Sequence, residues 1–264
     1  MLPRLLLIPL LAGPWAALAA DYTGLVHARH QLTLSVATAG VVAAVPVQPG
    51  RRVQAGQLLL QLDDRLQAIE EQRRKTVLDD RSELAAVDER LKLVLPLAED
   101  ARKLQGSKGA LSREDVARAE LDVVTTRGRL LQLQAQEERE RSEHQGAAQE
   151  RAQRRLLAPV AGVITKVGID VGEWARPGDA LVELVDASVL HLRVNVPAVA
   201  ARGLKEGATL AVRFEPALQL PDVQGQLSFV SPVVDAASGL VALRVQFANP
   251  GGRIPPGIKA QIKL

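Results

Sequence analysis

The sequence predicts an elongated α+β protein of several domains, in which a small β-unit is divided by a long antiparallel helical hairpin and followed by a small β-barrel. Three observations support this prediction. Residues 40–62 and 162–184 repeat one another, the residues between them are rich in charge and have a seven-residue apolar period, and residues 188–264 alternate short apolar runs with turn residues. This organisation is typical of a spacer that bridges a distance and not of an enzyme.

The internal repeat predicts that its two copies fold against one another. Its matched positions include the pairs Gly40 and Gly162, Gly50 and Gly172, Gly56 and Gly178, and Leu62 and Leu184. Glycine adopts positive φ angles without steric cost, which explains why the turns repeat more faithfully than the strands. We therefore expect residues 40–63 and 156–186 to be the two halves of one β-unit.

Residues 64–155, between the two halves, are expected to form the hairpin. A heptad seam predicts the first helix from Asp64 to Gln105; its members are Val77, Leu84, Val87, Leu91, Val94, Ala98 and Ala101. Pro96 is expected to kink this helix or to remove one backbone hydrogen bond. The second helix is expected to run to about Arg155, with one apolar face of Val116, Ala119, Val123, Leu130 and Leu133. Because two helices cover only one stripe of each other, we expect several copies to pack side by side in a ring.

The tip of the hairpin carries a helix-capping signal. Ser112 is a good N-cap for the second helix, with Glu114 and Asp115 in the first turn, where carboxylates favour the helix dipole. Two readings remain open for Leu111 beside it. The side chain is either a hydrophobic staple across the turn or a contact for a partner.

The two ends of the chain carry further signals. Residues 1–19 predict an export signal, with Arg4 before the apolar run Leu5–Leu11 and small residues at Ala17–Ala19. A retained anchor is the alternative, but the apolar run is short for a bilayer span. Residues 187–264 predict the barrel, because closure of a sheet removes exposed strand edges.

Composition gives no support for catalysis, metal binding, a cofactor or nucleic-acid binding. The chain has no Cys and one Met, and its net charge of +3 arises from basic residues that alternate with acidic ones. His27 and His30 fall on opposite faces of a strand, so they do not converge on a metal, and His144 and His191 are isolated in the sequence. Residues Asp63 and Asp186 end the two halves and are interpreted as turn residues.

Four segments of the chain resemble a known family. They are residues 23–26 with 40 and 49–63; the hairpin tip, 108–115; residues 158–164 with Gly172 and Gly178; and residues 231–235 with Asn249-Pro250, Arg253 and Pro256-Gly257. In these segments the chain is similar to the HlyD-like membrane fusion proteins. These are the periplasmic adaptor subunits of tripartite efflux systems, and the chain is most similar to the resistance–nodulation–division (RND) type.

The resemblance implies a fold and a role. It implies a lipoyl-like barrel-sandwich hybrid made by both halves, an α-helical coiled-coil hairpin, and a β-barrel that residues 24–39 join with one or two strands. It also implies a ring, commonly of six copies, that links an inner-membrane transporter to an outer-membrane channel in the periplasm of a Gram-negative bacterium. The residues that would contact the channel are Leu104, Gly109, Leu111, Ser112 and Arg113.

Two departures and two alternatives accompany the resemblance. The chain stops at Leu264, so the membrane-proximal domain of many RND-type members is expected to be absent, and Arg102 matches the tip arginine of the family poorly. One alternative is an adaptor of an ABC-type exporter. The other is a lipoyl or biotinyl carrier, which would need a modified lysine at the turn where this chain has its hairpin.

Overall fold

The computed structural model describes residues 20–106 and 111–264, which divide into two compact units. We call the first the barrel unit; its described residues are 20–32, Val160–Thr165 and Leu184–Leu264. We call the second the arm unit; it contains Thr33–Pro159 and Lys166–Glu183. The chain passes between them within the three strands β1 (Asp21–Leu34), β6 (Gly162–Val167) and β8 (Val182–Pro197), and also between Pro159 and Val160.

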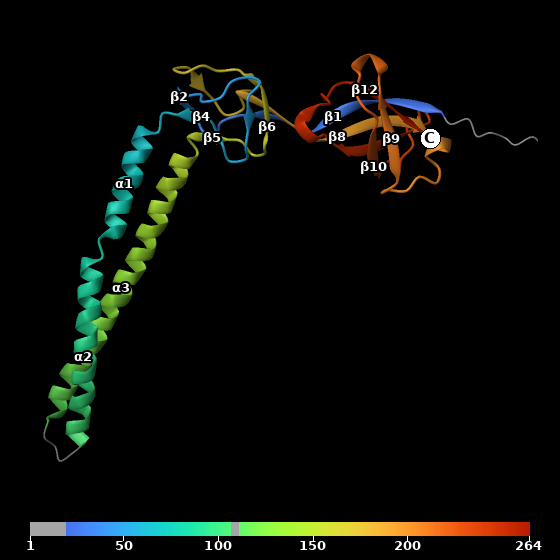
Figure 1. Cartoon of the computed structure of the whole chain (residues 1–264). Helices are drawn as coiled ribbons and strands as arrows, with labels where there is room; N and C mark the ends of the chain where they lie inside the picture. Colours follow the sequence, from blue (N-terminus) through green and yellow to red (C-terminus); the bar gives the residue numbers. More distant parts are fainter. Residues whose placement is uncertain (1–19, 107–110) are drawn as a thin grey trace, which may run out of the picture. The chain divides into compact units, whose positions relative to one another are not determined.

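Six strands of an eight-stranded sheet form the closed ring of the barrel unit. Besides β1 and β8 they are β9 (Thr209–Phe214), β10 (Val223–Val230), β11 (Leu240–Ala248) and β12 (Lys259–Lys263). Their order is β1-β12-β9-β10-β11-β8, and an additional pairing of β1 with β8 closes the ring (Figure 1). Short elements fill the connections: α4 (Ala198–Ala201), η1 (Pro216–Leu218) and η2 (Pro250–Gly252). The predicted barrel, with its N-terminal strand, is therefore present.

Alternation along the barrel strands builds its core. In β8 and β11 every second side chain is buried, as expected for strands with one face inward and one face in solvent. The buried residues include Val26, Leu190, Leu192, Leu243 and Ile262. Gly24 allows β1 to approach β8, because a Cβ at this position would lie 2.1 Å from the Arg193 carbonyl oxygen. A side chain at residue 24 is incompatible with this closure.

The two copies of the repeat fold together in the arm unit, as the sequence predicts. Four strands pair in the order β5-β4-β2-β7, with bounds β2 (Gly40–Ala44), β4 (Leu58–Leu62), β5 (Arg155–Leu157) and β7 (Trp174–Ala175). Gly40 of the first copy is paired with Ala175 of the second, and β3 (Arg52–Val53) is a short further strand. The turn glycines at matched positions, 50 with 172 and 56 with 178, all have positive φ.

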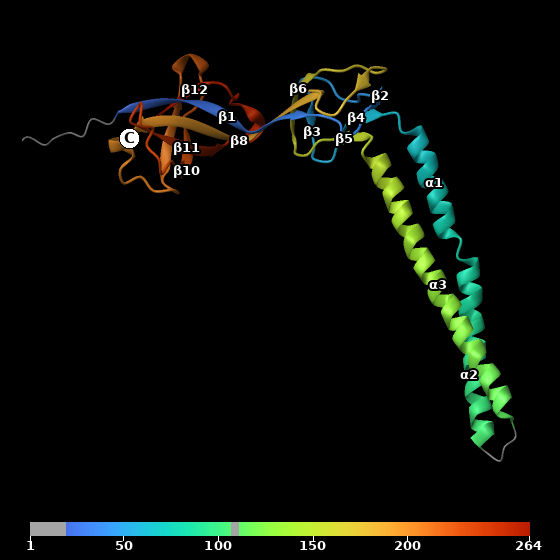
Figure 2. The ribbon, with the colours of Figure 1, turned by 180° about the vertical axis from the view of Figure 1, so that it is seen from behind.

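Three helices continue from this split sandwich. They are α1 (Arg65–Asp79), α2 (Ser82–Gly106) and α3 (Arg113–Ala152), and we call them together the arm. Both views show α1 and α2 lying along α3 (Figures 1 and 2). Ion pairs fix an antiparallel alignment: Arg90 contacts Asp122 at 2.8 Å, and Arg81 contacts Glu137 at 2.8 Å. No helix among the described residues is long and apolar enough to cross a membrane.

The first limb of the arm differs from the single helix that the sequence predicts. It breaks at Asp80 and Arg81, where Asp80 has extended backbone angles and its Oδ1 accepts hydrogen bonds from Ser82 N (3.2 Å) and Ser82 Oγ (2.6 Å). Local side-chain bonds of this kind compete with helix formation. Pro96, in contrast, lies within α2 without ending it.

The heptad seam is confirmed with one exception. The predicted seam residues of α2 are half-buried or buried, and so are the five predicted residues of α3. The prediction that Val77 belongs to the seam is wrong, because its side chain is 46% exposed and the neighbouring Leu78 is half-buried instead. The break at Asp80 shifts the helical phase between α1 and α2, so a seven-residue step across it does not keep one face.

Candidate functional site

The free end of the arm is the candidate site, and a capping box organises it. Ser112 Oγ accepts a hydrogen bond from the Asp115 backbone N–H (3.1 Å), and the Asp115 carboxylate accepts from Ser112 Oγ (2.6 Å) and more weakly from Ser112 N (3.4 Å). These bonds from Ser112, the side-chain bond first, lower the pKa of Asp115. The predicted N-cap is therefore confirmed, and α3 begins at a defined residue.

The predicted contact residues gather at this end. Leu104 lies in the last turn of α2 with 49% of its side chain exposed, whereas Leu111 is half-buried. Ser112 and Arg113 are exposed at the start of α3, and Gly109 lies outside the described residues. Arg102 is engaged with Glu120 across the arm at 2.5 Å. The tip thus offers one exposed leucine and one partly covered leucine on either side of the connection.

A second set of exposed apolar residues was missed by the sequence analysis. On α2 these are Leu93 and Leu97, which are followed seven residues later by Leu104, and on α3 they are Leu121, Val124 and Leu131. Each is at least 49% exposed. Their spacings of three, four and seven repeat the heptad period on a face away from the α2–α3 seam. The signal was present in the sequence as a second apolar stripe on each helix.

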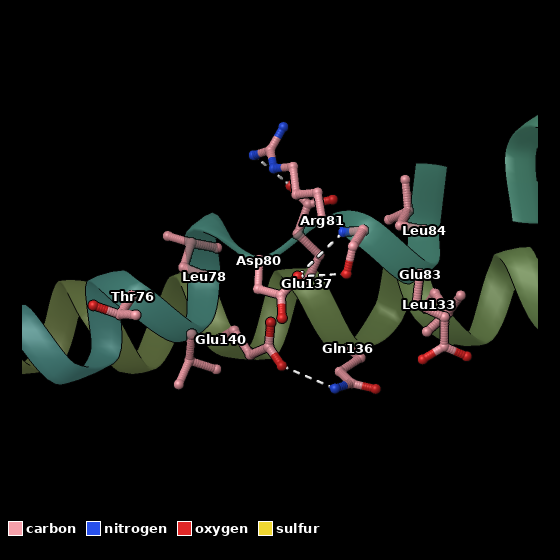
Figure 3. Close-up of a pocket in the computed structure, with 12 residues that line it drawn as sticks. Thr76, Leu78, Asp80, Arg81, Glu83, Leu84, Leu133, Gln136, Glu137 and Glu140 are labelled. Atoms are coloured by element: carbon pink, nitrogen blue, oxygen red, sulfur yellow. Dashed lines mark hydrogen bonds and ion pairs between the residues drawn. The ribbon is translucent and has the colours of Figure 1, made fainter. Parts of the chain in front are cut away.

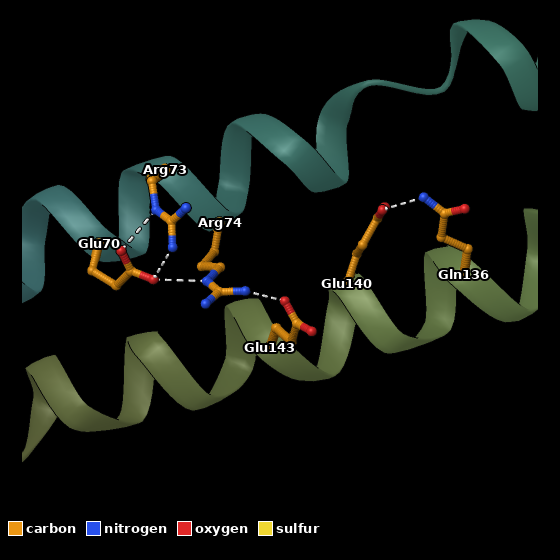
Figure 4. Close-up of polar contacts among 6 residues, drawn as sticks. All are labelled: Glu70, Arg73, Arg74, Gln136, Glu140 and Glu143. Carbon is orange, nitrogen blue, oxygen red and sulfur yellow. Dashed lines mark hydrogen bonds and ion pairs between the residues drawn. The ribbon is translucent and has the colours of Figure 1, made fainter.

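The half of the arm nearest the sandwich is held in a different way. No residue of α1 is buried. Arg151 of α3 contacts Asp64 at 2.9 Å and Glu71 at 3.0 Å, and Arg74 of α1 bridges Glu70 on its own helix and Glu143 on α3 (Figure 4). Hydrogen bonds from Arg73 and Arg74 lower the pKa of Glu70 to about 2. This half is therefore joined mainly by exposed charge pairs.

A cavity of about 460 Å³ lies at the break between α1 and α2. Figure 3 shows that α3 forms its floor, and its lining mixes apolar and acidic side chains, among them Leu78, Leu84, Leu133, Asp80, Glu137 and Glu140. Hydrogen bonds from Ser82 lower the pKa of Asp80, so this carboxylate stays charged as a turn residue. The cavity follows from the interruption of the first limb.

The isolated titratable residues of the sequence have structural partners. Asp63 receives hydrogen bonds from the Arg65 side chain and backbone, which lower the pKa of its carboxyl to about 2. Burial alone would raise the pKa of Asp186, but bonds from Ser188 and His30 outweigh burial and lower it. Asp63 therefore lies in the connection between β4 and α1, as the sequence predicts. The interpretation of Asp186 as a turn residue is wrong, because it is a buried residue within strand β8. Within the described part of the chain, no three His, Cys, Asp or Glu side chains converge as a metal site.

A split β-sandwich that carries a helical arm and is followed by a β-barrel is the architecture of a periplasmic membrane fusion adaptor. The family comparison agrees: residues 31–187 match the barrel-sandwich hybrid domain of RND membrane fusion proteins, and residues 190–264 match the CusB-like β-barrel domain. The chain belongs to the membrane fusion protein family. Members of this family are non-catalytic adaptors of the periplasm.

Solved structures share this fold at low sequence identity. MacA from Actinobacillus actinomycetemcomitans aligns with a TM-score of 0.69 and 17% identity over 93% of this chain and 78% of its own. A putative efflux transporter from Bacteroides eggerthii gives 0.56 and 19% over 93% and 68%. The membrane fusion protein Spr0693 from Streptococcus pneumoniae gives 0.56 and 14% over 92% and 97%. No curated protein sequence matches the chain.

Proposed function

We propose that this chain is an exported periplasmic adaptor that joins an inner-membrane transporter of the RND class to an outer-membrane channel. The RND class is supported by the matched barrel-sandwich model, which describes RND membrane fusion proteins. Contact with the channel rests on one observation: Leu104 stands 49% exposed at the free end of the arm, beside the capped start of α3. A leucine in this position favours burial against a partner.

The same proposal includes a ring of copies, commonly six, whose arms form a coiled-coil wall. The exposed stripes of Leu93 and Leu97 on α2 and of Leu121, Val124 and Leu131 on α3 support this part. The helices α2 and α3 bury one seam between them and leave these residues in water. Neighbouring arms packed side by side would cover them.

The carrier alternative receives no support from the connection between the two halves of the sandwich. The arm, and not a short turn with a lysine, stands between β4 and β5. We therefore do not propose a lipoyl or biotinyl carrier.

The proposed channel contact is tested by charging the tip without uncapping α3. We expect the L104D/L111D variant to abolish efflux and to lose crosslinking from a photoreactive group at Arg113 to the channel, while the helix content of the protein stays unchanged. L66D/I69D is the matched control, because it charges two exposed apolar residues of α1 at the opposite end of the arm and leaves the tip unchanged. Unchanged efflux and crosslinking in L104D/L111D would contradict the assignment of the tip.

The transporter class needs a separate experiment. We expect the full chain to co-purify from crosslinked cells with a transporter of the RND class. Recovery of an ABC exporter instead would keep the adaptor role and reject the RND assignment.

A further inference from the structure

Three arginines gather on the outer face of the barrel unit. Arg29 of β1, Arg193 of β8 and Arg244 of β11 are all exposed, and β8 is paired with both neighbouring strands. His27 and His191 lie two residues before Arg29 and Arg193 on the same faces of β1 and β8, because side chains two residues apart on a strand point the same way. We call these five residues the arginine face.

The pairing of the strands places like charges together. Arg193 is directly opposite Arg244 in the β8–β11 register, and like charges in opposite positions destabilise a sheet. The Arg244 guanidinium lies 5.7 Å from the centre of the Phe229 ring, a cation–π distance that holds it in place. The barrel thus keeps two arginines in opposite positions at a cost to its own stability, and one of them, Arg244, is held by Phe229.

No carboxylate balances this charge within the described residues. None of the three arginines takes part in an ion pair there, whereas Arg213 on β9 of the same barrel faces Asp222 at 3.5 Å. His30, whose partner is Asp186, belongs to the alternate set of β1 side chains and not to this face.

The lowered pKa values of the two histidines agree with an excess of positive charge on this face. Burial, followed by Arg244, Arg193, Arg29 and His27, lowers the pKa of His191, and burial followed by Arg193 lowers the pKa of His27. His191 Nδ1 is buried without a hydrogen-bond partner. Besides burial, the groups that shift these two pKa values are basic, in line with the lack of ion pairs to the three arginines among the described residues.

We propose that the arginine face binds an acidic segment of a protein partner, whose carboxylates lie between Arg29, Arg193 and Arg244. Guanidinium groups bind carboxylates through paired, charge-assisted hydrogen bonds. Most exposed neighbours on β8, β10 and β11 are polar, namely Asn195, Gln224, Gln226, Ser228 and Gln246, and the large apolar side chain exposed among them is Phe229, which lies under Arg244. Such a surface suits a hydrogen-bonding protein partner. A membrane surface would call for a broad apolar face, which these strands do not offer.

The experiment uses the full purified chain and a fluorescent hexaglutamate peptide as the probe. We expect binding that weakens with salt, and we expect R193Q/R244Q to lower the affinity about tenfold. R202Q/R253Q is the matched control, because it removes two exposed arginines of the same unit outside the face. It should lower the affinity less than about twofold. Equal losses in the two variants would overturn the proposal.

Two further measurements keep the proposal testable if the double variant folds poorly. The single variant R29Q, on a different strand, should also weaken the peptide. In the parent chain, NMR titration should show that the peptide raises the pKa of His191, because a nearby carboxylate favours the charged imidazole. An unchanged pKa of His191, or tighter binding to phosphatidylglycerol vesicles than to the peptide, would overturn the proposal.

Discussion

Asn249 offers the sharpest test of how the barrel unit is held together. Its side chain is 2% exposed, and Nδ2 donates to the carbonyl oxygens of Ala187 (3.0 Å) and Ile254 (2.8 Å), while Oδ1 accepts from Ile254 N (3.0 Å). N249A removes three hydrogen bonds and leaves their backbone partners unsatisfied. At about 1 kcal/mol for each bond, we expect a loss of about 3 kcal/mol in the free energy of unfolding of this unit.

N249D is the more severe change at neutral pH. It keeps the volume of the side chain but places a carboxylate oxygen against two carbonyl oxygens, so it should destabilise more than N249A. Those acceptors raise the pKa of the new carboxyl in the folded state. The variant is therefore most stable below the unfolded pKa of about 3.9 and loses stability as the pH rises through the raised folded value.

Native-state hydrogen exchange of the β8 and β11 amides measures both variants. N195A is the control, since Asn195 is exposed on β8 and its replacement should change the free energy by less than about 0.5 kcal/mol. A loss below about 1 kcal/mol in N249A, or an N249D variant as stable as N249A at pH 7, would refute the role assigned to these bonds.

Two other predictions concern the closure of the barrel and the polar half of the arm. G24A should destabilise the barrel unit by about 2–3 kcal/mol, because the new Cβ would meet the Arg193 carbonyl oxygen at 2.1 Å. G128A, where the Cβ meets open space in α3, should be neutral or stabilising; equal effects in hydrogen exchange would contradict this account. The pKa of Glu70 is lowered to about 2, so its ion pairs contribute above pH 4.5 and are lost as the pH falls towards 2. Both partners of Glu70 lie on α1, so the helix content measured by circular dichroism should fall over this pH range, and E70Q should reduce that fall. The pairs Arg74–Glu143 and Arg151–Glu71 join α1 to α3, so spin labels at K75C and Q145C should separate in about 1 M salt. Labels at E89C and R127C, across the apolar seam of α2 and α3, should not separate, and the absence of Cys from the chain allows each pair to be placed alone.

The split sandwich could be predicted because its turn glycines are local signals and occur at matched positions in both copies of the repeat. Matching glycines at 50 and 172, and at 56 and 178, mark turns that need a positive φ, and the structure has these turns in both copies. The seam of α2 and α3 was equally accessible, since one apolar stripe on each helix had only the other helix to cover it. Both predictions therefore rested on repeated patterns in the sequence: the internal repeat for the sandwich and the apolar period for the helices.

The break in the first limb was harder to predict, because local side-chain hydrogen bonds compete there with continuation of the helix. Asp79, Asp80 and Ser82 carry polar side chains that cap a helix as readily as they continue one, and Asp80 bonds to Ser82 at 2.6 Å. The heptad pattern on either side suggested a single helix from Asp64 to Gln105. Pro96 was the expected site of a kink in the first helix, yet it lies inside α2 and removes only its own N–H.

The arginine face was invisible in the sequence for a different reason. Arg29, Arg193 and Arg244 lie far apart along the chain, each among residues of ordinary composition. The net charge of +3 gives no sign that they lie on one face. Only the closure of β1 on β8 and the pairing of β8 with β11 bring them together. Charge that alternates along the chain can therefore gather into one sign on a folded surface. It follows that alternating charge along the sequence excludes a basic run, but does not exclude a basic binding surface on the barrel.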